Sequence, residues 1–93
     1  MRSYVYMTAS KKHGTLYTGV TNDLRHRVYQ HKEFLLGGFT QNHGVHLLVY
    51  YEEHSDIRDA IAKEEQLKKW NRAWKIRLIE KTNPDWRDSY DDL

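Results

Sequence analysis

Alternation between apolar and polar positions dominates the first twenty residues of the chain. The segments 3–9 (SYVYMTA) and 15–21 (TLYTGVT) are rich in β-branched and aromatic residues, and SKKHG between them has the length of a hairpin loop. We therefore predict two antiparallel strands. Successive side chains of a strand point to opposite faces, so Tyr17 and Gly19 share one face of the second strand. The hairpin is predicted to have one tyrosine-rich and one aliphatic face.

Helix-capping residues and helix breakers divide the rest of the chain into three helices and a third strand. The strand is the apolar run 46–52 (HLLVYYE). The predicted helices lie between Thr21 or Asn22 and Gly37–Gly38, between Ser55 or Asp56 and about Trp70, and between Asn71 and Pro84 of NPDW.

The order β-β-α-β-α-α predicts an α+β fold in which helices flank a three-stranded antiparallel sheet. A chain of 93 residues has room for one domain. We place this domain at residues 1–87 and predict that the acidic residues 88–93 form a flexible C-terminal tail.

The composition is that of a globular protein without a membrane span. The net charge is +2 at pH 7 and the chain has no cysteine. No apolar run approaches the roughly 20 residues that cross a bilayer, and the chain begins directly with the strand pattern, without a signal segment. We therefore expect a cytoplasmic protein with no membrane partner, and the mildly basic charge slightly favours an anionic partner.

The first predicted helix combines charged and apolar side chains on one stripe. At about 100° per residue, Arg27 and His31 point the same way as Leu24, Val28 and Leu35. A charged side chain that points inward needs a partner, a metal ion or a solvent-filled cleft, because an unpaired buried ion costs several kcal/mol.

The second predicted helix places a carboxylate in the same situation. Glu64 falls near the middle of its apolar stripe, whose other members are Ile57, Ala60, Ile61 and Leu67. Two explanations remain open. Either Arg27 and Glu64 form a salt bridge that joins the helices, or both helices and the tyrosine-rich sheet face surround an active site.

The second explanation suits one chemistry in particular. A carboxylate can hold Mg²⁺ together with substrate phosphate, an arginine binds phosphate oxygens through two N–H groups, and a tyrosine hydroxyl can position or deprotonate a water. These three groups together indicate phosphodiester cleavage.

The sequence resembles the GIY-YIG nuclease superfamily, and in particular its small single-domain members, from about Tyr4 to Trp86. Tyr4 stands where the superfamily name has glycine, and Thr18 where it has isoleucine. The matching positions are Tyr6 in YVY, Tyr17 and Gly19 in YTG, Arg27 and His31 in TNDLRHRVYQH, Glu64 in AIAKEEQLKKW and Asn83 in NPDW.

This resemblance implies a DNA endonuclease that uses a single divalent ion, Mg²⁺ or Mn²⁺, held by Glu64. Arg27 would neutralise the non-bridging phosphate oxygens while water attacks the phosphorus in line, which leaves 5′-phosphate and 3′-hydroxyl ends. Tyr17 is the first choice to activate the water, Tyr6 the second, and His31 a substitute base. The implied nucleic-acid contacts are Gly19, Arg27, Lys68, Lys69 and Asn83.

The implied substrate is branched, nicked or damaged DNA in repair or recombination, because a lone small domain has little surface for reading sequence. Two alternatives stay open. One is a nucleic-acid-binding module that cleaves slowly or not at all, and the other is an interaction domain whose protein partner supplies specificity. The loop 37–46 offers the polar residues Thr40, Gln41, Asn42 and His43 and no lysine or arginine, which predicts weak or strongly salt-sensitive DNA binding.

Three further features have structural explanations. Trp70, Trp74 and Trp86 are predicted to hold the last helix on the sheet, although an exposed tryptophan could stack on a base. Asn83 either joins the site or only caps the NPDW turn. The six histidines show no i, i+4 pair and there is no cysteine, so a zinc site is not expected.

Overall fold

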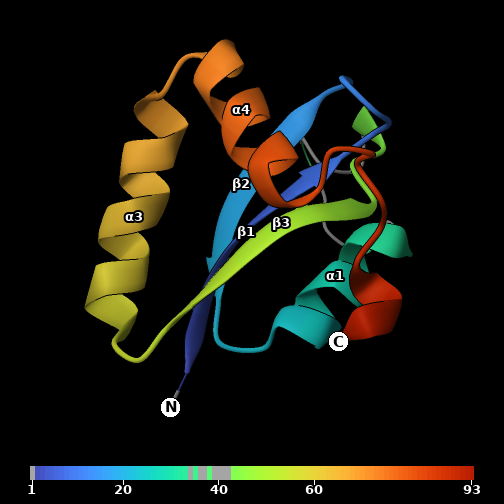
Figure 1. Ribbon diagram of the computed structural model, residues 1–93. Helices are drawn as coiled ribbons and strands as arrows, with labels where there is room; N and C mark the ends of the chain where they lie inside the picture. Colours follow the sequence, from blue (N-terminus) through green and yellow to red (C-terminus); the bar gives the residue numbers. More distant parts are fainter. Residues whose placement is uncertain (1, 34, 36–37, 39–42) are drawn as a thin grey trace.

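The computed structural model describes residues 2–33, 35, 38 and 43–93. In this part of the chain, three antiparallel strands form one sheet in the order β2-β1-β3, with helices on both faces (Figure 1). The element order confirms the predicted α+β fold. The elements are β1 Ser3–Ala9, β2 Leu16–Thr21, α1 Leu24–Lys32, β3 Leu47–His54, α3 Ile57–Lys69, α4 Arg72–Thr82 and the 3₁₀ helix η1 Tyr90–Asp92.

Strand β1 is central and pairs antiparallel with both neighbours. Its register places Tyr6 between Gly19 of β2 and Tyr51 of β3. The pairing with β3 shifts by one residue between Met7 and Thr8, which is a β-bulge. Strands β2 and β3 are therefore the two edges of the sheet.

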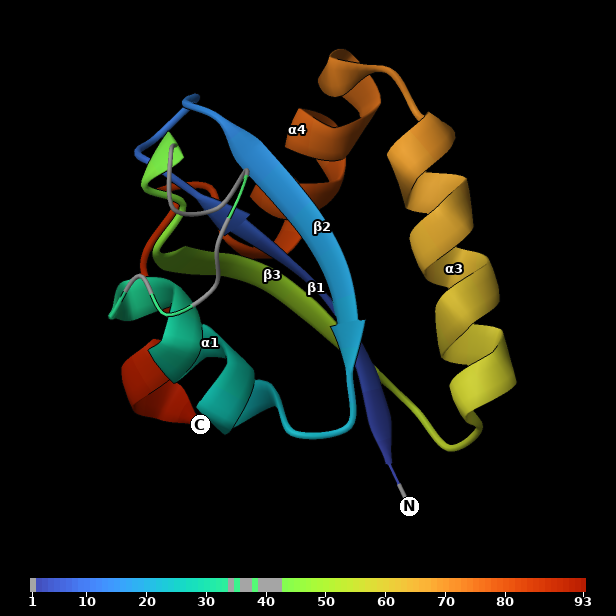
Figure 2. The same ribbon diagram turned by 180° about the vertical axis from the view of Figure 1, so that it is seen from behind.

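The two faces of the sheet differ in composition, as the alternation predicts. The aliphatic face packs against α3 and α4 through two clusters of buried residues, Val5, Ala60 and Leu67 in one and Met7, Ala9, Val49, Ile79 and Trp86 in the other. On the opposite face, Tyr6 packs with Leu24 and Val28 of α1. Figure 2 shows the edge strand β2 in front, with α1 on one side of it and α3 on the other.

Helix α1 differs from its prediction at both ends. Its N-cap is Asp23, whose carboxylate accepts a hydrogen bond from the backbone N–H three residues later at 3.3 Å. Thr21 instead accepts a hydrogen bond from the N–H of Asp23 at 3.0 Å. A carboxylate at this position satisfies a free N–H and complements the positive end of the helix dipole, which explains why Asp23 is the cap.

The same helix ends at Lys32 rather than at the predicted glycine pair. Leu35 therefore lies outside the helix and is 63% exposed, so its predicted place on the inward stripe is wrong. Of the polar loop residues expected to weaken DNA binding, 40–42 lie outside the described residues. No helix among the described residues has both the length and the apolar character that a bilayer crossing requires.

Helices α3 and α4 begin at the predicted caps. Asp56 accepts a hydrogen bond from the N–H of Arg58 at 2.8 Å, and Asn71 accepts one from the N–H of Trp74 at 2.9 Å. These caps depend on residues within three positions of each other, and such local signals are visible in the sequence.

The outward side of both helices carries more apolar surface than predicted. Ile57 and Ile61 of α3, expected to point inward, are 45% and 41% exposed. Trp86 is buried, as a residue that holds α4 on the sheet should be, but Trp74 is 50% exposed and does not have this role. The buried residues of α3 are Ala60 and Leu67, and Ile57 and Ile61 lie about 60° and 100° around the helix from Ala60.

The C-terminal residues 88–93, for which the sequence predicts a flexible tail, lie against α1 and β3. Asp88 forms an ion pair with Lys32 of α1, and its other carboxylate oxygen accepts a hydrogen bond from the N–H of Leu48 at 3.1 Å. The N–H of Ser89 donates to the carbonyl of Leu48 at 2.9 Å. The Tyr90 ring centre is 5.1 Å from the ammonium nitrogen of Lys32. These contacts connect the last residues to both elements.

Candidate active site

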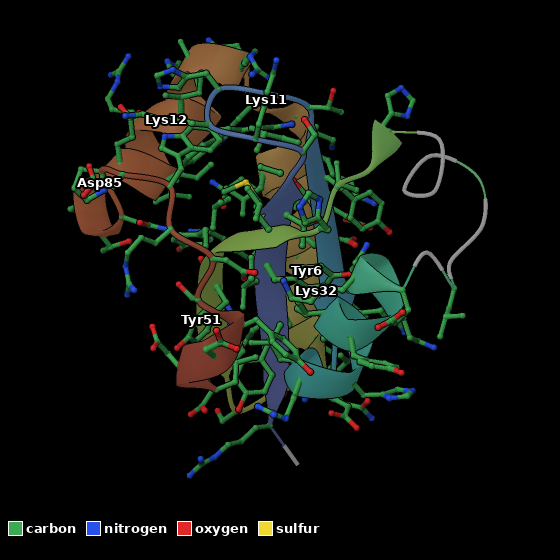
Figure 3. All side chains as sticks on the ribbon, turned by 90° about the vertical axis from the view of Figure 1, so that its right-hand side faces the viewer. Tyr6, Lys11, Lys12, Lys32, Tyr51 and Asp85 are labelled. Atoms are coloured by element: carbon green, nitrogen blue, oxygen red, sulfur yellow. The ribbon has the colours of Figure 1, made fainter. Side chains whose placement is uncertain are left out.

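Tyr6 is the buried centre of the candidate site. It lies in the middle of the central strand, and its side chain is fully buried on the α1 face of the sheet (Figure 3). Its hydroxyl oxygen is 2.9 Å from Nε2 of His31. Gly19 of β2 lies directly opposite Tyr6 in the sheet. A Cβ atom at Gly19 would be 2.6 Å from the Tyr6 hydroxyl oxygen and 2.7 Å from the ring carbon that carries it. Glycine at position 19 therefore leaves the space that the Tyr6 ring fills.

His31 is 2% exposed, and its Nδ1 has no hydrogen-bond partner among the described residues. Burial, followed by the positive charge of Arg27, lowers the pKa of His31 to about 4. The ring is therefore neutral at pH 7. A proton on Nδ1 would leave a buried N–H without an acceptor, which is rarer in proteins than a buried acceptor without a donor. We therefore assign the tautomer that carries its proton on Nε2 and donates to the Tyr6 hydroxyl oxygen. The hydroxyl proton of Tyr6 is then left to donate elsewhere.

Tyr17 completes a cluster of three rings. Its ring centre is 6.3 Å from that of Tyr6 and 5.2 Å from that of His31. Unlike these two residues, Tyr17 is only half-buried. It is thus the member of the cluster whose side chain reaches solvent.

Arg27 approaches Tyr6 from α1, one turn before His31, and is half-buried. Burial, followed by the neighbouring Tyr17, raises the pKa of Tyr6 far above its ordinary value. The charge of Arg27 and its hydrogen bond to Tyr6 act in the opposite direction. The guanidinium therefore lies within bonding reach of the Tyr6 hydroxyl.

Glu64 lies on α3, which packs on the other face of the sheet, and its negative charge is the smallest of the contributions to the raised pKa of Tyr6. Its side chain is 15% exposed and forms an ion pair with Lys68 at 3.4 Å. The i, i+4 spacing from glutamate to lysine is the sequence signal that could have predicted this pair. Among the ion pairs of the described residues there is none between Arg27 and Glu64, so the interhelical salt bridge is not formed.

The remaining implied nucleic-acid contacts do not all join this cluster. Lys68 does so through its ion pair with Glu64. Lys69 is exposed, and its position is about 140° around α3 from that of Glu64. The side-chain amide of Asn83 donates to the carbonyls of Val49 at 3.2 Å and Arg87 at 2.8 Å, and accepts from the N–H of Arg87 at 2.9 Å. Val49 belongs to β3, at the sheet edge opposite β2.

The donor groups near Tyr6 fit a hard divalent ion that is only partly held by protein. Among the described residues, no three histidine, aspartate or glutamate side chains gather to form a metal cage. Mg²⁺ is commonly bound through one or two carboxylates, with water and substrate phosphate as the other ligands. Glu64 supplies such a carboxylate, and its partner Lys68 is 52% exposed and can move away.

Comparison with known proteins places this arrangement in a family. A family model described as the GIY-YIG catalytic domain matches residues 2–77. The chain belongs to the GIY-YIG family. This is a nuclease-type family, which implies a nucleic-acid substrate and generally a divalent metal. The matched range includes Tyr6, Tyr17, Arg27, His31 and Glu64 and ends before Asn83.

Similar GIY-YIG proteins are small, like this chain. It is 36% identical over 77 residues to a UPF0213 protein of Clostridium perfringens, a match that covers 83% of this chain and 82% of the relative. It is 35% identical over 86 residues to a UPF0213 protein of Syntrophus aciditrophicus, with 90% and 95% covered. The solution NMR structure of a UPF0213 protein from Bacillus halodurans is similar with a TM-score of 0.59 and 26% identity, over 96% of this chain and 94% of that one.

Proposed function

We propose that this protein is a metal-dependent DNA endonuclease that hydrolyses phosphodiester bonds. The observation that carries the proposal is that Arg27 of α1 and Glu64 of α3 both act on the buried Tyr6 hydroxyl by their charge, while no ion pair joins the two. A purely structural pair of opposite charges would be expected to meet. A cation and a carboxylate near one tyrosine that are not paired with each other suit a phosphate and its metal ion.

In the proposed reaction, Arg27 binds the non-bridging oxygens of the scissile phosphate and neutralises the charge that builds up in the transition state. Glu64 would hold Mg²⁺ or Mn²⁺, which when bound supplies Lewis-acid stabilisation of the leaving 3′ oxygen. The water oxygen forms the new bond to phosphorus as the bond to the 3′ oxygen breaks. The products are a 5′-phosphate and a 3′-hydroxyl.

Different exposure separates the proposed roles of the two tyrosines. Tyr17 is half-buried and can contact the attacking water, so we assign to it the proton transfer from that water. The Tyr17 oxygen takes a proton from the attacking water as its own hydroxyl proton passes to solvent, and a solvent proton ends on the departing 3′ oxygen. Tyr6 is fully buried, and its raised pKa keeps its hydroxyl protonated, so no phenolate is present to take a proton from water. We propose that Tyr6, fixed by His31, positions the neighbouring Tyr17 ring and the Arg27 guanidinium, which contact the water and the phosphate.

The same proposal covers the substrate and the remaining residues. Lys68 and Lys69 would contact the DNA backbone, whereas Gly19 acts by leaving room for the Tyr6 ring. The substrate we propose is branched, nicked or damaged DNA of the repair and recombination type, because the small domain has little surface for reading sequence. We also propose a cytoplasmic location, which suits a chain without cysteine.

A matched pair of glutamates on α3 tests the proposal. The purified protein is incubated with linear, nicked and branched DNA in Mg²⁺ or Mn²⁺, beside the variants Glu64→Gln and Glu65→Gln. Glu65 is the exposed neighbour of Glu64, so its variant controls for the loss of one charge on the helix. We expect cleavage to fall about a hundredfold or more in Glu64→Gln, to stay unchanged in Glu65→Gln, and to stop when the metal is chelated.

Equal cleavage by wild type and Glu64→Gln would refute the nuclease. Arg27→Ala beside Arg25→Ala, an exposed arginine of the same helix, provides an independent comparison. Salt-sensitive binding to DNA without any cleavage would instead show that the protein is a nucleic-acid-binding module. If the protein neither binds nor cleaves DNA, it is an interaction domain that depends on a protein partner.

A further inference from the structure

The end of α3 and one face of α4 form a surface groove of aromatic and basic side chains. The groove has a volume of about 330 Å³ and is lined by Trp70, Trp74, Arg77, Leu78 and Lys81. Trp74, Arg77, Leu78 and Lys81 follow the i, i+3, i+4, i+7 spacing of a single helix face. The buried residue of this helix, Ile79, lies about 140° from Trp74. Leu78 and Trp70 also pack against buried core residues, whereas Trp74, Arg77 and Lys81 are exposed and form the solvent side of the groove.

The two indoles of the groove differ in how firmly they are held. Trp70 packs against the buried cluster of Val5 and Leu67, and the ammonium of Lys63 lies 6.0 Å from the centre of its ring. The Trp74 ring is nearly perpendicular to Trp70, with an interplanar angle of 88° and a centroid distance of 5.8 Å. Trp70 thus supports one side of Trp74, while half of the Trp74 surface is exposed.

The charge around this exposed ring has one sign. Arg77 and Lys81 are one turn apart on α4, and none of the five residues that line the groove is acidic. An apolar partner would have to cover both cations without a counter-charge, which costs free energy. A ligand that carries a flat ring and regularly spaced negative charges would satisfy both the indole and the cations. Stacked bases joined by phosphates have this chemistry.

Positive charge also continues from the groove toward the candidate active site. The end of α3 and the start of α4 form one corner of the molecule (Figure 1). Burial, then Arg72 and Lys68, lower the pKa of Lys75 at this corner, so the three cations lie near one another. Lys68 also pairs with Glu64. The cations at the corner thus include the ion-pair partner of Glu64 and, in Lys75, the chain neighbour of Trp74.

We propose that the groove between Trp70 and Lys81 binds an unpaired segment of DNA, with a base stacked on Trp74 and its phosphates against Arg77 and Lys81. This inference rests on the proposed nuclease function and specifies its substrate. Trp70, the C-cap of α3, follows Glu64 by six residues, a rise of about 9 Å along the helix and a turn that separates their sides by about 120°. The preferred substrate therefore has a duplex at the active site and a single strand that turns around the corner onto α4.

The binding of a short oligonucleotide tests the groove separately from cleavage. A fluorescein-labelled single strand of roughly twelve thymidines, within the usual site size of such proteins, is titrated by anisotropy without metal, beside a blunt duplex with the same label. We expect Trp74→Ala to weaken single-strand binding about tenfold or more, since stacking on one aromatic ring has this effect. Trp74→Phe should retain most of the affinity, and duplex binding should change less than twofold in both variants.

Matched controls distinguish this site from general charge and from cleavage. Tyr29→Ala removes an equally exposed aromatic ring from α1, and Arg58→Ala removes an exposed cation from α3, so both should bind the single strand like wild type. Glu64→Gln should also keep single-strand affinity. If it does so but no DNA is cleaved by wild type, the nuclease proposal fails while the groove survives.

Two outcomes would overturn the groove proposal. One is single-strand affinity of Trp74→Ala within twofold of wild type, even if Glu64→Gln abolishes cleavage. The other is concentration-dependent self-association in sedimentation that Trp74→Ala removes while oligonucleotide affinity is unchanged, because this would assign the groove to a second copy of the chain. A thermal melt of Trp74→Ala should match wild type, since the residue is half exposed.

Discussion

Gly19 lies directly opposite Tyr6 in the β1–β2 pair, and its missing side chain is the space that the Tyr6 ring occupies. This relationship connects the two strand motifs physically. The ring can occupy this position and contact His31 only because the residue opposite has no Cβ. Position 19 thus controls the geometry of Tyr6 without any chemistry of its own.

Gly19→Ala is expected to destabilise the protein and to reduce cleavage. The new methyl group would collide with a fully buried ring, and overpacking of this kind costs about 1–3 kcal/mol of unfolding free energy. Urea unfolding of wild type and variant measures the cost. In a Tyr6→Leu background the ring is absent, so the same substitution should cost little. An equal cost in both backgrounds would show that the strain does not involve Tyr6.

His31 should make folding stability depend on pH. Burial and Arg27 lower its folded pKa to about 4, and the unfolded value is about 6.5, so the unfolded chain binds more protons between these values. The contribution is present above pH 6.5 and is lost as the pH falls toward 4. Its full size is about 3 kcal/mol. Urea unfolding from pH 7.5 to 4 should show a shallower dependence in His31→Gln, and identical slopes would contradict the low pKa.

Asn83→Ala should lower stability by about 1–3 kcal/mol, because the side chain makes one hydrogen bond to Val49 of β3 and two to the backbone of Arg87, which close the NPDW turn. Asp85→Ala, an exposed residue of the same turn, is the matched control and should melt like wild type. Both variants are also assayed for cleavage below their melting temperatures. A loss of cleavage with unchanged stability would assign Asn83 to the DNA contact that the family resemblance implies.

Asp88→Ala should also destabilise the fold. It removes the partner of Lys32 and leaves the N–H of the buried Leu48 without its acceptor, at a cost of about 1–3 kcal/mol. For a domain of this size the melting temperature should fall by several degrees. Asp91→Ala, which is exposed, should leave it unchanged. If Asp88→Ala melts like wild type, residues 88–93 behave as the flexible tail that the sequence predicts.

The sequence by itself determined the features that depend on near neighbours. Strand alternation separated the tyrosine-rich from the aliphatic face, and the caps Asp56 and Asn71 were visible because each bonds an N–H within three residues. Helical periodicity also placed Arg27 and His31 on the side of α1 that faces Tyr6. Local backbone geometry fixes these relations before any tertiary contact forms.

The tertiary structure decided which of the possible partners each side chain meets. By sequence Glu64 could pair with Arg27 of another helix or with Lys68 one turn away, and in the structure it pairs with Lys68. The packing of α3 on the sheet buries the side with Ala60 and Leu67 and leaves Ile61 exposed. Asp88 reaches Lys32 across 56 positions. Such contacts depend on how whole elements pack against one another, and residue spacing along the chain carries no direct record of that packing.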